Sequence, residues 1–289
     1  MRSHVVRLLS LVVVVASACE PSAGSPSSEV EGEHEHEAAS SAAADNEVLP
    51  IVVEGTRLVV RKTDGTIATE TEILGAKLVV SVDGRAPQLV RVDSIEEDTK
   101  SDDGEILLYE LSSQDATGQW VNVCPADPDG LQRGFLLSGT WTKTGEHLRD
   151  DANIELSCTS GAVGKCLRMG YRPWENDTQF ARHQACTRML RADYCGNGAS
   201  YTKNGTLINV FDPAGIQKAE PTEDLRFEAA WGPDGAVCLH HPRIPENGSL
   251  EDIVRACPER LTGRTGDACT AEAALADPKA LVLNESRMR

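Results

Sequence analysis

The sequence is poor in aromatic side chains and in basic ones. Phe, Trp and Tyr make up 4% of its 289 residues, which leaves little material for a platform on which sugars stack. Lys and Arg number 28 against 45 Asp and Glu, and the net charge is −17. General binding of nucleic acid depends on many phosphate contacts from Lys and Arg, so this composition argues against a nucleic-acid partner.

Metal and phosphate motifs are also missing. No Cys-x-x-Cys pair occurs, and the cysteine spacings do not match a zinc knuckle or ribbon, so we predict no metal and no cofactor. Gly164-Lys165 matches the Gly-Lys pair of a phosphate-binding loop. However, Thr159 stands where that loop requires glycine, and Cys166 replaces its Ser or Thr.

The apolar run from Leu8 to Val15 is too short for a transmembrane helix, which needs about 20 apolar residues. Arg2 and Arg7 lie within the first seven residues, and Ala16-Ser17-Ala18 follows the run. A basic start, a short apolar stretch and small residues are typical of a secretory signal. We therefore predict export, with residues 1–18 as the signal peptide.

The four residues Ala16-Ser17-Ala18-Cys19 resemble the lipobox of bacterial lipoproteins, in which the cysteine carries a diacylglycerol. In the lipobox, leucine is commoner at the position that Ala16 occupies here. An ordinary signal peptidase would also cut between Ala18 and Cys19, and it would leave Cys19 without lipid. We predict lipidation of Cys19, since several acyl chains on one residue give stable anchoring. The predicted location is then a membrane surface of the cell envelope, facing the periplasm or on the outer membrane. Without the lipid the protein would be secreted.

Residues 19–47 are predicted to be a disordered tether that starts at the lipidated cysteine. The stretch 20–47 is rich in Ser, Ala, Pro and Glu, and it carries eight acids and no Lys or Arg. Such a composition buries too little apolar surface to offset chain entropy. As a flexible coil it would reach about 30 Å. His34 and His36 are interpreted as part of this solvated acidic linker rather than as metal ligands.

Nine cysteines occur, and lipid on Cys19 leaves an even number for the folded part. In an oxidising compartment an even number indicates disulfides, here up to four. The pairing stays open. The predicted disulfide cysteines are Cys124, Cys158, Cys166, Cys186, Cys195, Cys238, Cys257 and Cys269.

The fold class predicted from local patterns is α+β, with more strand than helix. Residues 48–113 contain short strands rich in Val, Ile and Leu, separated by Asp-Gly turns, and form a β-rich N-terminal unit. Residues 114–245 form a cysteine-rich domain and 246–289 a helical segment. The best helix runs over 178–191 with Asp177 or Thr178 as its cap. Turns at Asn204-Gly205 and at Gly232 to Gly235 predict two hairpins.

The cysteine-rich part contains several separate and distinctive motifs. They are Cys158-Thr-Ser-Gly-Ala-Val-Gly-Lys-Cys166, Gly170-Tyr-Arg-Pro-Trp174, His183-Gln-Ala-Cys186-Thr-Arg-Met, Ala192-Asp193-Tyr194-Cys195, Phe227-Glu-Ala-Ala-Trp231 and Gly235-Ala-Val-Cys238. Together these motifs resemble the ADYC-domain family of bacterial secreted proteins and lipoproteins. The resemblance covers roughly Gly118 to His241 and implies export and a shared cysteine-rich fold. The family has no established activity, so the resemblance implies no catalytic residue.

An enzyme is one alternative that the residues leave open. His183 and Cys186 share a face of the predicted helix, and Asp193 follows it. These residues are candidates for a Cys–His nucleophile pair, or for a His base oriented by a carboxylate, as in hydrolases. A free Cys186 would leave an odd number of cysteines in the folded part. A pair three residues apart on one helix is also badly placed to hold a substrate between its side chains.

Recognition of an anionic envelope ligand is a second alternative. Between residues 164 and 203, seven basic side chains stand against three acidic ones, while residues 48–289 carry −11 overall. Such a contrast favours negatively charged ligands. The candidate ligand-binding residues are Arg188, Arg191 and Tyr194. Against both alternatives, the sequence favours a non-enzymatic exported lipoprotein whose disulfide-stabilised domain has a structural or binding role.

Overall fold

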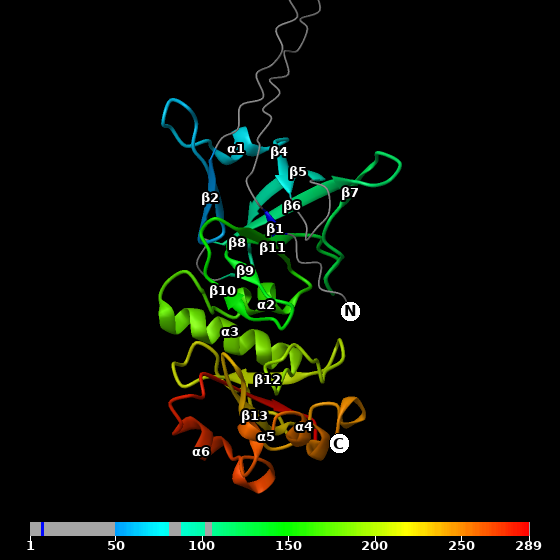
Figure 1. Ribbon diagram of the computed structural model, residues 1–289, viewed down its shortest axis with the longest axis vertical. Coiled ribbons are helices and arrows are strands. Elements are labelled where there is room, and N and C mark those ends of the chain that lie inside the picture. Colours follow the sequence, from blue (N-terminus) through cyan, green and yellow to red (C-terminus); the bar gives the residue numbers. More distant parts are fainter. Residues whose placement is uncertain (1–6, 9–49, 81–87, 102–105, 289) are drawn as a thin grey trace, which may run out of the picture.

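The computed structural model describes residues 7–8, 50–80, 88–101 and 106–288 (Figure 1). Only Arg7–Leu8 (β1) of the predicted signal peptide is described; the cleavage site, Cys19 and residues 20–47 lie outside the described residues. The described part is α+β with more strand than helix, as predicted. No helix among the residues that are described has the length and apolar character to cross a membrane.

The first sheet is antiparallel and has seven strands in the order β1-β11-β8-β6-β5-β4, with β7 paired to β6. Its strands after β1 are β4 (Lys77–Val80), β5 (Gln88–Glu97), β6 (Leu107–Gln114), β7 (Trp120–Asn122), β8 (Gly134–Ser138) and β11 (Ile154–Cys158). The sheet therefore continues past residue 113, where the sequence patterns placed the end of the β-rich unit.

One face of this sheet is covered by the hairpin of β2 (Ile51–Glu54) and β3 (Arg57–Val60) and by α1 (Glu70–Ile73). Strand alternation places Leu78, Val92 and Leu111 on this face, where they are buried. The Tyr109 hydroxyl, also on this face, accepts a hydrogen bond from the backbone N–H of Leu58 at 2.8 Å. This bond fixes the hairpin to the sheet.

The other face packs against α2 (Ala162–Arg168) and the short hairpin of β9 (Thr140–Trp141) and β10 (His147–Leu148). Leu167 of α2 and Trp141 of β9 join Phe135 and Leu137 of β8 in a second apolar cluster. Arg168 at the end of α2 is held by the buried Asp98, with Nε 2.7 Å from Oδ2. The ion pair ties the helix to the end of β5.

The long helix α3 (Asp177–Arg191) lies between the two sheets (Figure 1). It begins one residue before the predicted start. The side chain of Asn176, rather than Asp177 or Thr178, caps it by accepting the N–H of Gln179 at 2.9 Å. The helix ends at Ala192, whose backbone is left-handed with φ 49° and ψ 43°.

The second sheet is antiparallel with the order β12-β15-β13-β14. Its strands are β12 (Ile208–Phe211), β13 (Arg226–Gly232), β14 (Gly235–Leu239) and β15 (Val282–Ser286). The predicted hairpin of β13 and β14 is confirmed. The hairpin predicted at Asn204-Gly205 is wrong, because β12 pairs with β15 instead of with residues 200–202.

The C-terminal segment contains helices, as predicted, but its last strand enters the sheet. The helices are η1 (Pro245–Asn247), α4 (Leu250–Ala256), α5 (Pro258–Leu261), η2 (Gly266–Ala268) and α6 (Ala271–Leu275). Strand β15 follows them and lies between β12 and β13, where Val282 and Leu283 are fully buried. A segment predicted to be helical thus supplies a central strand.

Candidate functional site

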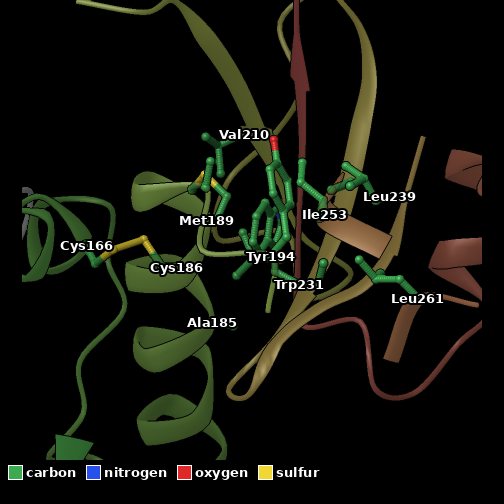
Figure 2. Packing of buried hydrophobic residues seen from close by; sticks show 14 of the residues in the cluster. Cys166, Ala185, Cys186, Met189, Tyr194, Val210, Trp231, Leu239, Ile253 and Leu261 are labelled. Atoms are coloured by element: carbon green, nitrogen blue, oxygen red, sulfur yellow. A yellow bond between two sulfur atoms is a disulfide. The ribbon is translucent and has the colours of Figure 1, made fainter. Parts of the chain in front are cut away.

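All eight cysteines predicted to form disulfides do so. The pairs are Cys124–Cys158, Cys166–Cys186, Cys195–Cys257 and Cys238–Cys269. The second pair joins α2 to α3 and lies in the apolar cluster of Figure 2. Because the sulfur of Cys186 is bonded to Cys166, it offers no free thiol, and the hypothesis of a Cys–His nucleophile pair is wrong for this structure.

His183 is a core residue of α3 with no exposed surface. Its Nε2 lies 3.2 Å from the carbonyl oxygen of Val163, and its ring makes edge contacts with Trp141 and His147. Burial lowers the pKa of His183 to about 3, with a further contribution from the neighbouring His147. A group that is neutral and shut off from solvent cannot exchange protons with a substrate at the surface.

Asp193, the proposed partner of His183, faces elsewhere. Its carboxylate accepts the backbone N–H groups of Asn197 (3.1 Å) and Gly198 (2.9 Å) in the loop after α3. It also forms an ion pair with Arg188, with Oδ2 2.6 Å from Nη1. Among the described residues no hydrogen bond joins Asp193 to His183, so the structure does not assemble the predicted base and its orienting carboxylate.

The three candidates for ligand binding do not form an exposed surface. Arg188 is 3% exposed; besides Asp193, it donates to the carbonyl oxygens of Thr144 and Pro233. It therefore ties α3 to the turns of both neighbouring hairpins. Arg191 is half-buried and donates to the carbonyl oxygen of Gly198 at 2.7 Å. The prediction failed because a count of charges along the chain carries no information on burial.

Tyr194 is fully buried beneath the second sheet, with its ring stacked on Trp231 at 5.1 Å between ring centroids (Figure 2). Its hydroxyl donates to Oε1 of Glu228 at 3.0 Å and accepts the backbone N–H of Arg243 at 2.9 Å. Burial raises the pKa of Tyr194 well above its usual value. The residue anchors a polar network inside the core and has no surface to offer a ligand.

Sequence reasoning missed the centre of that network, the ion pair of Glu228 and Arg243. The guanidinium of Arg243 donates two hydrogen bonds to the carboxylate of Glu228, both at 2.9 Å. Asn284 of β15 donates a third to the same carboxylate at 2.8 Å. Burial acts to raise the pKa of Glu228, but the charge and hydrogen bonds of Arg243 outweigh it and lower that pKa. The signal in the sequence was Glu228, a charge with apolar residues on both sides of it in β13.

The four residues Ala192 to Cys195 each have a structural task. Ala192 supplies the left-handed end of α3, Asp193 organises the following loop, Tyr194 joins the buried network, and Cys195 is bonded to Cys257. The part of the chain that the structure describes holds no group of three or more His, Cys, Asp or Glu side chains arranged to bind a metal ion.

Comparison with known proteins identifies one relationship. The family model described as "ADYC domain" matches residues 70–245. No curated protein and no solved structure matches the chain. The matched region begins well before Gly118, where the resemblance in the motifs starts, and so includes most of the first sheet.

Proposed function

Because the chain belongs to the ADYC domain family, we propose that it acts as an exported structural or binding module of the cell envelope rather than as an enzyme. One observation carries the proposal. The residues for which the family is named here, Ala192 to Cys195, are directed into the fold and hold α3, the following loop, the second sheet and α4 together. None of them presents a reactive group to solvent.

The disulfides support export. Four bonds stabilise the described part of the chain, and disulfides persist in oxidising compartments outside the cytosol. With all eight folded-domain cysteines paired, Cys19 is the cysteine left over for lipid. We propose that acyl chains on Cys19 anchor the module and that residues 20–47 let it move within about 30 Å of the membrane surface.

The anchor is tested on the full-length chain, produced in a bacterial host that processes lipoproteins. We expect the protein to be in the membrane fraction and its N-terminal peptide to have the mass of an acylated Cys19. The Cys19→Ser variant should move to the soluble fraction, whereas Ser28→Ala in the same tether should stay with the membrane. A wild-type N-terminal peptide without acyl mass, from protein in the soluble fraction, would rule out the anchor.

The non-enzymatic role is tested through the thiols. Alkylation of the purified protein without reductant, in mild denaturant, should label none of the cysteines from Cys124 to Cys269, and labelling after reduction should reach all eight. A native population in which Cys186 is labelled would restore the nucleophile hypothesis, because His183 lies one helical turn away on the same helix.

A further inference from the structure

A hollow of about 470 Å³ lies at the end of the second sheet, between the start of β13, the end of β14 and the η2–α6 segment. Arg226, His240 and Asp267 provide its charged or titratable lining, and Phe227 and Met288 provide apolar surface. The disulfide of Cys238 and Cys269 fixes its wall, because Cys269 is one of the lining residues. The hollow is open to solvent, and its lining combines apolar surface with a few polar groups, a mixture that small-molecule sites share.

His240 is connected to the buried network by a chain of hydrogen bonds whose direction can be worked out. Glu228 is ionised by its pairing with Arg243, so it only accepts, and the hydroxyl of Ser286 donates to it. The oxygen of Ser286 is then the acceptor for Nε2–H of His241 at 3.2 Å. Burial lowers the pKa of His241 and keeps this ring neutral.

A neutral His241 with its hydrogen on Nε2 has a lone pair on Nδ1. That atom lies 3.2 Å from Nδ1 of His240, which must therefore carry a hydrogen and donate it. The other ring nitrogen, Nε2, takes no part in the contact with His241. This nitrogen is the polar atom that His240 can offer to a molecule in the hollow, and in the tautomer with its hydrogen on Nδ1 it is an acceptor.

The two charged residues complete a set of complementary groups. Arg226 is exposed at the rim, where its Nη1 donates to the carbonyl oxygens of Glu223 and Leu225, both at 2.8 Å, and this holds the guanidinium in place. Guanidinium groups bind carboxylates. Asp267 is exposed on η2 and offers a negative charge. The hollow thus combines a guanidinium that binds carboxylates, a carboxylate and an imidazole nitrogen.

We infer that this hollow binds an α-amino acid with an apolar side chain. The ligand carboxylate pairs with Arg226, its ammonium group donates to Asp267 and to Nε2 of His240, and its side chain packs on Phe227 and Met288. A simple anion would be repelled by Asp267 and a simple cation by Arg226, so a zwitterion uses both charges. The inference rests on the module being a binding rather than a purely structural one; it is independent of the anchor on Cys19.

The test uses the full-length, disulfide-bonded chain, with L-leucine, L-methionine and L-phenylalanine as probes in isothermal titration calorimetry. We expect saturable binding of at least one probe. Its N-acetyl and amide derivatives should each bind at least about tenfold more weakly, because each lacks one of the two charges. Since these comparisons need no variant, they remain valid whatever a substitution does to folding.

Variants then assign the charges. Arg226→Gln should weaken binding of the free amino acid at least about tenfold, and this variant should bind the amide as well as the free amino acid. Asp267→Asn should weaken binding of the free amino acid to the same extent, and it should bind the N-acetyl derivative as well as the free amino acid. Arg255→Gln, an exposed arginine on α4 that pairs with Asp252, is the matched control and should leave binding unchanged. Absence of saturable binding by all three probes at millimolar concentration, or equal binding of free and blocked forms, would overturn the inference. Either result would leave the outcome of the Cys19 experiment unaffected.

Discussion

Arg243 and Glu228 form an ion pair in the centre of the second core, and their side chains are 2% and 0% exposed. Removing one partner of such a pair leaves an uncompensated buried charge, which commonly costs about 3–5 kcal/mol. We expect Arg243→Met to lower the free energy of unfolding by that amount in urea titrations. The double variant Arg243→Met/Glu228→Gln leaves no charge at this site and should recover a large part of the loss. A single variant as stable as the wild type would contradict the structural role of the network.

Two buried histidines make stability depend on pH at the scale of single residues. Burial lowers the pKa of His147 to about 4 and that of His183 to about 3, whereas in the unfolded chain both titrate near about 6.5. Above that value neither ring is charged in either state, so their stabilising contribution is complete. As the pH falls below it, the unfolded chain takes up protons that the folded chain cannot. Each histidine then costs about 1.4 kcal/mol per pH unit, down to its folded pKa.

Urea unfolding between about pH 6.5 and pH 4.5 measures this loss. Carboxylates also contribute to the pH dependence of the free energy of unfolding, so the informative quantity is the difference in its slope between variants. We expect His183→Gln to reduce the slope of the free energy of unfolding against pH by about 1.4 kcal/mol per pH unit relative to the wild type. His36→Gln, in the segment predicted to be a solvated tether, should leave it unchanged. Equal slopes for wild type and His183→Gln would mean that His183 is protonated in the folded protein.

The position of His183 on the helix could be predicted, but its environment could not. The helical period places His183 and Cys186 on one face of residues 178–191. That this face is sealed depends on Trp141 and His147, which come from a hairpin about forty residues earlier in the chain. The candidate site failed for this reason: its residues have the types that catalysis uses, but neighbours distant in sequence bury them.

At the scale of an element, the residue that caps the start of α3 differs from the predicted one. Asn176 accepts the N–H of Gln179, and removal of such a cap costs about 1 kcal/mol. We therefore expect Asn176→Ala to lower the free energy of unfolding by about that amount, measured by denaturant titration. Thr178→Ala, at the cap position that the sequence pattern allowed, should change stability by less than about 0.5 kcal/mol. A larger loss of stability in Thr178→Ala than in Asn176→Ala would show that the helix begins later than in the structure.

Elements formed by neighbouring residues were the ones that the sequence predicted well. The helix over 178–191 and the hairpin at Gly232 to Gly235 depend on short-range periodicity and turn chemistry, and both form. The pairing of β12 with β15 joins Val210 to Asn284 across more than seventy residues. No local signal specifies such a partner, because pairing over that separation is selected by burial of both strands in the completed core. The turn at Gly205 forms, with φ 79°, but the strand before it does not.

At the scale of the whole molecule, the two sheets share α3. Ala185, Cys186 and Met189 of α3 contribute to the core of the second sheet, while His183 on the same helix packs with Trp141 beside the first. The disulfide of Cys166 and Cys186 links α2, which covers the first sheet, to this helix. A boundary at residue 113 would cut the first sheet within β6, and one at residue 245 would separate β15 from the second sheet.

The extent of the family match leads to a prediction about autonomous folding. Residues 70–245 lack β15, which lies between β12 and β13, and they lack the partners of Cys195 and Cys238. A fragment limited to the match would leave two strand edges unpaired and the carboxylate of Glu228 without Asn284. We expect the 70–245 fragment to show no cooperative denaturant transition and two reactive thiols, whereas residues 48–289 unfold in one cooperative transition with every cysteine protected. If the 70–245 fragment instead unfolds cooperatively, β15 is dispensable and the helices after residue 245 are an appendage rather than part of the domain.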